Sequence, residues 1–87
     1  MVDESKIQVT VKLFAIYQEV LDTSELELAL SSGTTVGEVL ALLIEQQPQL
    51  SKWQEVTRFG VNLQFVDSTT ALQNGDELVL IPPVSGG

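Results

Sequence analysis

One segment of the chain has a marked start, a helical pattern and a marked end, and it constrains the fold more than any other feature. Thr35 and Glu38 have the spacing of a capping box, which predicts Thr35 as a helix N-cap. Apolar residues then recur at helical spacing at Val36, Val39, Leu40, Leu43 and Ile44. Because Pro48 cannot continue a helix, the sequence predicts one main helix over residues 36–47.

Alternating runs before this helix predict a pair of β-strands. Apolar and polar residues alternate over residues 7–13 and again over residues 25–30. Between them, Asp22-Thr23-Ser24 forms a turn cluster after a short turn or helical piece near residues 18–21. Two strands separated by so short a connection suggest an antiparallel hairpin.

Beyond the helix, residues 49–55 suit a helical turn and residues 56–61 a strand, with Gly60 as a weak spot or bulge. A tight turn follows and leads into a short return strand at Phe65. Asn74-Gly75-Asp76 is a further strong turn signal, and an alternating run comes after it. We therefore predict an α+β fold of the β-grasp (ubiquitin-like) type. In this fold one main helix packs across a mixed sheet, the first and last strands are adjacent, and the C-terminal tail projects.

Length and composition exclude several classes of protein. A chain of 87 residues makes one domain, for which we expect a flexible N-terminus at 1–6, the domain at 7–81 and a tail at 82–87. A net charge of −8 with four cations argues against nucleic-acid and membrane partners. The chain has no Cys or His, which disfavours disulfides, metal sites and Ser-His or Cys-His nucleophiles. The N-terminal residues lack the pattern of a signal peptide, so we expect a soluble, cytoplasmic protein.

The tail Pro82-Pro83-Val84-Ser85-Gly86-Gly87 is the segment that carries chemistry. Two prolines end sheet pairing and favour an extended path, while two glycines have no side chains and suit a narrow cleft. Six extended residues reach about 20 Å. Adenylation by ATP would activate a carboxylate at Gly87, and a sulfur nucleophile could then replace AMP. A disordered end in which Gly-Gly occurs by chance is the alternative.

The same tail resembles the C-terminus of the small, sulfur-carrier subunit of molybdopterin synthase. The resembling segments are residues 74–87, Val11-Lys12-Leu13-Phe14-Ala15 and Gly60-Val61-Asn62, and the Pro-Pro-Val-Ser-Gly-Gly ending is the specific part. Members of this family have the ubiquitin-like fold. An E1-like enzyme adenylates their terminal glycine, which becomes a thiocarboxylate, and the large subunit uses that sulfur to build the dithiolene of molybdopterin.

The resemblance implies a role for each tail residue and a set of partners. Gly87 would be adenylated and then thiolated, and residues 82–86 would thread the partner's cleft. The chain would be a co-substrate that binds no cofactor, with ATP used by the activating enzyme and the catalytic side chains on the large subunit. The implied partners are the large subunit, in a heterotetramer, and the E1-like adenylating and sulfurating enzyme. One departure is Gln18, where the family frequently has a basic residue.

Two other functions remain open. The chain could carry sulfur for thiamine thiazole or another product, because such carriers share the Gly-Gly ending. It could also be a ubiquitin-like protein modifier or interaction domain whose glycine is joined to a lysine, because the activation chemistry is the same.

Three apolar residues are candidates for partner docking. Phe14 follows a core residue at the end of the first strand, and Ile81 follows one at the end of the last strand. Because side chains alternate along a strand, both should point to the face opposite the core. If the first and last strands are neighbours, the two side chains share an exposed face beside the tail. Phe65 begins the short return strand and is the third candidate. Exposed apolar patches of this kind often mark interfaces, and the family docks such a patch on its large subunit.

Overall fold

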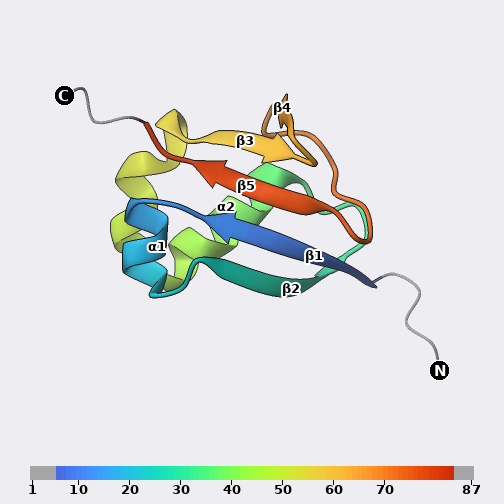
Figure 1. The fold of residues 1–87 in the computed structure, drawn as a ribbon, viewed down its shortest axis with the longest axis horizontal. Helices are drawn as coiled ribbons and strands as arrows, with labels where there is room; N and C mark the ends of the chain where they lie inside the picture. The colour runs from blue at the N-terminus through green and yellow to red at the C-terminus, as the bar shows by residue number, and fades with distance from the viewer. Residues whose placement is uncertain (1–5, 84–87) are drawn as a thin grey trace.

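The computed structural model describes residues 6–83 as one mixed sheet with helices on one face (Figure 1). In chain order the elements are β1 (Lys6–Leu13), α1 (Ile16–Leu21), β2 (Glu25–Ser31), α2 (Val36–Gln46), the 3-10 helix η1 (Pro48–Val56), β3 (Arg58–Val61), β4 (Gln64–Val66) and β5 (Glu77–Ile81). The order of strands across the sheet is β2-β1-β5-β3-β4. This is the predicted β-grasp fold, with α2 crossing the sheet.

The first and last strands lie side by side in the middle of the sheet, as predicted. β1 and β5 are parallel and pair from Thr10 with Glu77 to Leu13 with Leu80. The other pairs, β1 with β2, β3 with β5 and β3 with β4, are antiparallel. Because β1 and β5 are parallel, they end at the same side of the molecule, beside α1 and η1 (Figure 1). The predicted tail therefore leaves from the centre of the sheet.

The capping box at the start of α2 is confirmed. The Thr35 hydroxyl oxygen accepts a hydrogen bond from the Glu38 N–H at 3.1 Å, and a Glu38 carboxylate oxygen accepts from the Thr35 N–H at 2.9 Å. The next N–H groups donate to loop carbonyls: that of Val36 to Thr70 at 2.9 Å and that of Gly37 to Ser68 at 3.0 Å. A Cβ at Gly37 would lie 2.8 Å from the Ser68 carbonyl oxygen, so only glycine permits this contact.

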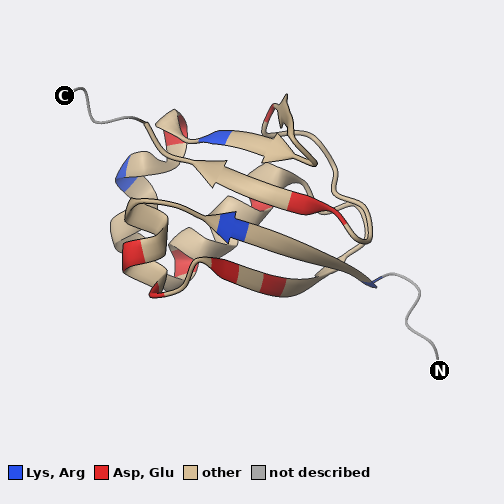
Figure 2. Ribbon diagram, in the orientation of Figure 1, with Lys and Arg blue, Asp and Glu red and all other residues tan. Residues whose placement is uncertain are grey.

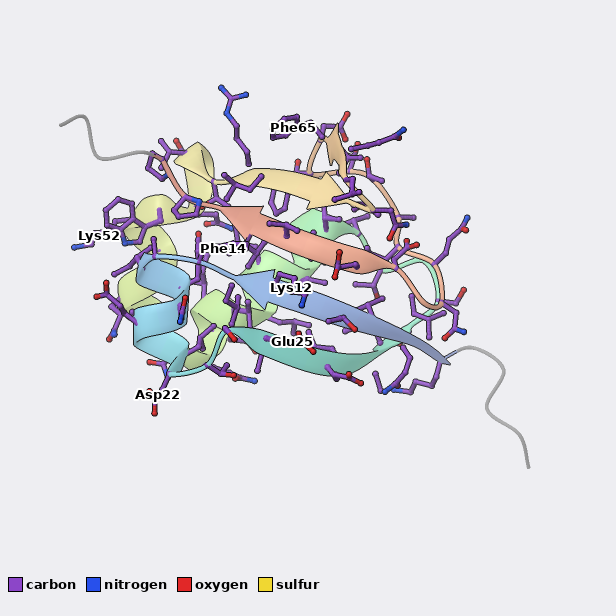
Figure 3. All side chains as sticks on the ribbon, viewed as in Figure 1. Lys12, Phe14, Asp22, Glu25, Lys52 and Phe65 are labelled. Atoms are coloured by element: carbon purple, nitrogen blue, oxygen red, sulfur yellow. The ribbon has the colours of Figure 1, made fainter. Side chains whose placement is uncertain are left out.

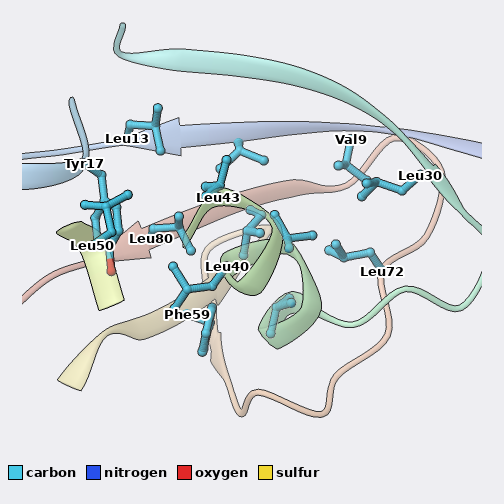
Figure 4. Packing of buried hydrophobic residues seen from close by; sticks show 14 of the residues in the cluster. Val9, Leu13, Tyr17, Leu30, Leu40, Leu43, Leu50, Phe59, Leu72 and Leu80 are labelled. Atoms are coloured by element: carbon cyan, nitrogen blue, oxygen red, sulfur yellow. The ribbon is translucent and has the colours of Figure 1, made fainter. Parts of the chain in front are cut away.

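The core fills the space between the sheet and α2 (Figure 4). Strand residues with the predicted alternation supply one wall and α2 the other; they include Val9, Val11, Leu13, Leu78, Leu80, Val36, Val39, Leu40 and Leu43. The sequence pattern did not indicate three further core residues, Tyr17, Phe59 and Leu72. Tyr17 and Leu50 pack where α1 and η1 close the end of the core from which β5 leaves.

The predicted strand over residues 56–61 begins two residues too early. Val56 ends η1 and is exposed, and β3 begins at Arg58. Thr57 keeps this stretch helical because its hydroxyl donates to the Trp53 carbonyl at 2.7 Å. Of the weak spot or bulge expected at Gly60, the bulge is wrong, since Gly60 pairs in register with Phe65 and Val79.

Candidate functional site

The site is built around the point where β5 leaves the sheet. Ile81 is the last residue of β5, and Pro82 and Pro83 follow outside regular structure. Two hollows flank this exit. One, of about 600 Å³, is lined by residues of α1 and η1 together with Ile81, Pro82 and Pro83. The other, of about 630 Å³, lies toward Arg58. A segment leaving here is accessible from both sides, as insertion into a partner requires.

The residues expected to carry the chemistry, Gly86 and Gly87, and those expected to thread the cleft with them, Val84 and Ser85, lie outside the described residues. Their roles stay predictions. Pro82 and Pro83 are the described part of the predicted threading segment, and both stand at the exit between the two hollows.

The three predicted docking residues lie on the surface, and we call them the docking patch: Phe14, Ile81 and Phe65. Phe14 is 52% exposed and Phe65 is 75% exposed, while Ile81 is half-buried. Phe14 and Ile81 line the same hollow at the tail exit. Phe65 lies on the edge strand β4, away from Phe14 (Figure 3).

Gly60 separates the two parts of the docking patch. It pairs with Phe65 on one side and Val79 on the other. A Cβ at Gly60 would lie 3.8 Å from the Val79 Cβ and 3.9 Å from the Ile81 Cδ1. Gly60 thus shares its face with Val79 and Ile81. Apolar side chains of β5 and β4 lie on either side of it and form an apolar band, which the exposed Arg58 borders where it pairs with Ile81. Docking itself remains a prediction.

An ion-pair cluster stands beside this band on the same face of the sheet. The Lys12 ammonium lies 2.6 Å from a Glu25 carboxylate oxygen and 3.9 Å from one of Glu77 (Figure 3). The hydrogen bond to Glu25, together with the charge of Glu25, raises the pKa of Lys12 above its usual value. Lys12, one of the four cationic residues of the chain, is thus paired with carboxylates of the same molecule. Acidic residues occupy β2, α1 and the start of β5 (Figure 2).

A buried pair of hydroxyls holds the exit end together. The Tyr17 hydroxyl of α1 is hydrogen-bonded to the Thr57 hydroxyl, which in turn donates to the Trp53 carbonyl of η1. Burial raises the pKa of Tyr17 above its usual value, and the hydrogen bond to Thr57 acts the other way. Sequence reasoning missed both residues. Tyr17 lies on a helix too short to show a periodic pattern, and Thr57 was assigned to a strand.

Within residues 6–83, no group of three or more acidic side chains is placed to hold a metal ion. None of the helices in that part of the chain is long and apolar enough to span a membrane. The described site therefore consists of an exit point, the two hollows and an apolar band. Such an arrangement suits the presentation of a chain segment to another protein.

Known proteins are similar to this chain in both sequence and fold. The molybdopterin synthase sulfur carrier subunit of Arabidopsis thaliana is 32% identical over 98% of this chain and 88% of its own length. That of Chlamydomonas reinhardtii is 34% identical over 93% of this chain and its whole length. The crystal structure of small archaeal modifier protein 1 from Haloferax volcanii matches with a TM-score of 0.77 at 31% identity, covering 92% of this chain and 99% of that one. The model of the ThiS family matches residues 11–87, and the chain belongs to the ThiS family.

Proposed function

We propose that this chain is the sulfur carrier of molybdopterin synthesis and that the carboxylate of Gly87 is its reactive group. An E1-like enzyme adenylates the carboxylate with ATP and releases pyrophosphate. A hydrosulfide (HS⁻) equivalent then attacks the carbonyl carbon, AMP leaves with the electron pair of the former C–O bond, and a thiocarboxylate forms. The large subunit of molybdopterin synthase takes up the tail and uses the sulfur for the dithiolene. The chain itself acts as a co-substrate.

The central position of β5 is the observation that carries this proposal. β5 pairs with β1 up to Leu80 and with β3 up to Ile81, the residue before Pro82. The tail therefore starts from a rigid point, and six residues can carry a carboxylate about 20 Å from it. Full-length similarity to two proteins named molybdopterin synthase sulfur carrier subunit supports the choice of molybdopterin among sulfur products.

The tail makes the proposal testable. Deletion of Gly87 withdraws the carboxylate by about 3.5 Å, and a displacement of this size is enough to lose a positioned reaction. We expect the deletion variant to fold normally and to fail in both adenylation and thiocarboxylate formation, as followed by pyrophosphate release and intact mass. Glu45→Gln is the control, because Glu45 is exposed on α2 outside both hollows, the change leaves the tail intact, and the variant should be adenylated like the wild type. Normal adenylation of the deletion variant would place the reactive group elsewhere.

A second function has one observation in its favour. Small archaeal modifier protein 1 of Haloferax volcanii is 34% identical over 87% of this chain, and its name describes a modifier. The same activated glycine would then be joined to a lysine of a target protein. Intact mass of the purified chain and peptide mass spectrometry of lysates distinguish the two. A sulfur-for-oxygen mass change supports the carrier, and Gly-Gly remnants on lysines that disappear with Gly87 support the modifier.

A further inference from the structure

The hollow between α1, η1 and the end of β5 has a lining suited to one kind of side chain. Apolar groups form most of its wall: Phe14, Ile16, Trp53, Ile81, Pro82 and Pro83. Among the described residues that line it, Glu19 alone is charged. Apolar walls with a single carboxylate fit a long side chain that has an apolar stem and a cationic head. We call this hollow the exit pocket.

Glu19 is available to such a head group. The side chain is exposed and makes no ion pair or hydrogen bond with the other residues of the described part of the chain. Lys12 is already paired with Glu25 and Glu77 on the sheet face. A cation from another protein would therefore meet a carboxylate that no cation among residues 6–83 pairs with, and Lys52 would compete with it only for the Trp53 ring.

Trp53 provides an aromatic ring that can bind the same cationic head group as Glu19. The Lys52 ammonium lies over the Trp53 ring, 5.6 Å from its centroid, so the indole already accepts a cation at the surface. A guanidinium stacks on aromatic faces better than an ammonium and is more weakly hydrated. It can also form two parallel hydrogen bonds with a carboxylate such as that of Glu19. The chemistry of the pocket thus favours arginine over lysine.

The backbone is strained at Ala15, in the turn that forms part of the pocket wall. Ala15 has φ +52° and ψ −123°, a conformation that glycine adopts easily and alanine does not. The residue lines the pocket between Phe14 and Ile16, and it starts α1 without a side-chain cap. The strain is therefore located at the turn that places Phe14 and α1 around the pocket.

We propose that the exit pocket receives an arginine side chain of the large subunit of molybdopterin synthase when that subunit takes up the tail. The proposal rests on the proposed function for the identity of the partner. Phe14 and Ile81 belong both to the pocket and to the docking patch, so a partner covering the patch also covers the pocket. The arginine aligns the tail at its base, before the glycines enter the cleft.

The pocket is first tested without any partner. Nα-acetyl-arginine methylamide is titrated into the full chain labelled with ¹⁵N, with Nα-acetyl-norleucine methylamide as the apolar control. We expect the arginine probe to shift the amides of Phe14, Ile16 and Glu19 and the Trp53 indole. Glu19→Gln should weaken binding on the order of fivefold, while Lys52→Gln should strengthen it by removing the competing cation. Equal binding of norleucine, or shifts spread along β2, would overturn the proposal.

The second test uses the large subunit and separates this proposal from the function on which it rests. Glu19→Gln should weaken binding of the large subunit on the order of fivefold and leave adenylation unchanged. Glu45→Gln is the matched control, since it removes the same charge from an exposed helical site outside the pocket. Equal binding by both variants, or a defect only in adenylation, overturns the pocket assignment while the carrier function stands. Absence of binding by the wild type would instead count against the carrier function.

Discussion

Among residues 6–83, two hold backbone conformations that their side chains disfavour, and both lie at the surface. Ala15 has φ +52° at the exit pocket, and Leu63 has φ +73° in the turn between β3 and β4. Leu63 is also 93% exposed, so no packing compensates for its strain. Asn62, the preceding turn residue, has φ +50°, which suits asparagine. Neither strain can be deduced from composition or periodicity, because it depends on the exact turn that the flanking strands impose.

The strain at Leu63 leads to a stability prediction. Leu63→Gly should raise the free energy of unfolding by roughly 0.5–1 kcal/mol, because relief of the left-handed strain exceeds the added entropy of the unfolded chain. Chemical denaturation measures this change. Gln64→Gly is the control, since Gln64 begins β4 without a positive φ, and it should destabilise the protein. Equal losses at the two positions would mean that residue 63 carries no strain.

At the level of elements, the segments with their own local signals were predicted and those fixed by tertiary contacts were not. The capping box and Pro48 define α2 within one residue, and the alternation of residues 7–13 gives β1 and its buried face. The start of β3 was wrong because it depends on the hydrogen bond from Thr57 to Trp53, four residues back. For the site, the sequence predicted the exposed Phe14, while the tail predicted beyond Pro83 lies outside the described residues and stays a prediction. The exit pocket brings together α1, η1 and β5, three elements that only the folded chain places side by side.

The hydroxyl pair of Tyr17 and Thr57 joins two of these elements, and it predicts a response to pH. Burial raises the pKa of Tyr17 above the ordinary 10.0, so the folded state favours the neutral phenol. Its contribution is fully present below pH 10 and is lost as the pH rises through the folded pKa. The wild type should therefore lose stability more steeply above pH 10 than Tyr17→Phe does.

Thermal melts between neutral and alkaline pH test this difference, and Tyr17→Phe itself should cost about 1 kcal/mol at neutral pH. Lys12, whose pKa is also raised, loses its ion pair in the same alkaline direction, so only the difference between the two proteins reports on Tyr17. Because the chain has a single tyrosine, its tyrosinate absorbance follows the ionisation directly. Parallel pH curves for the two proteins would show that burial does not perturb Tyr17.

On the scale of the whole molecule, the acidic side chains of β2 and the exposed apolar side chains lie on different parts of the surface. The exit pocket, with Phe14 and Ile81 of the docking patch, lies around the end of β5, and Phe65 lies on β4. Glu25 and Glu27 lie on the opposite edge strand β2 (Figure 2). A net charge of −8 acts at a distance on any basic partner, whereas apolar contacts act only after collision. The fold thus separates the carboxylates of β2, which attract a partner at a distance, from the apolar groups that retain it, while Glu19 is the carboxylate of the exit pocket.

This separation predicts how binding of the large subunit depends on salt. The screening length shortens from about 10 Å at 0.1 M to about 3 Å at 1 M ionic strength, so the association rate should fall steeply across this range. The dissociation rate should change by no more than about fivefold, the effect expected for loss of the Glu19 ion pair in the exit pocket, because the apolar band and the bound tail hold the rest of the complex. Surface plasmon resonance at several salt concentrations separates the two rates.

The double variant Glu25→Gln, Glu27→Gln should associate more slowly at low salt with a shallower salt dependence, and Phe14→Ala should raise the dissociation rate alone. If salt changes the dissociation rate by more than about fivefold, charges other than Glu19 act within the interface, and the assignment of attraction and retention to different surfaces is wrong.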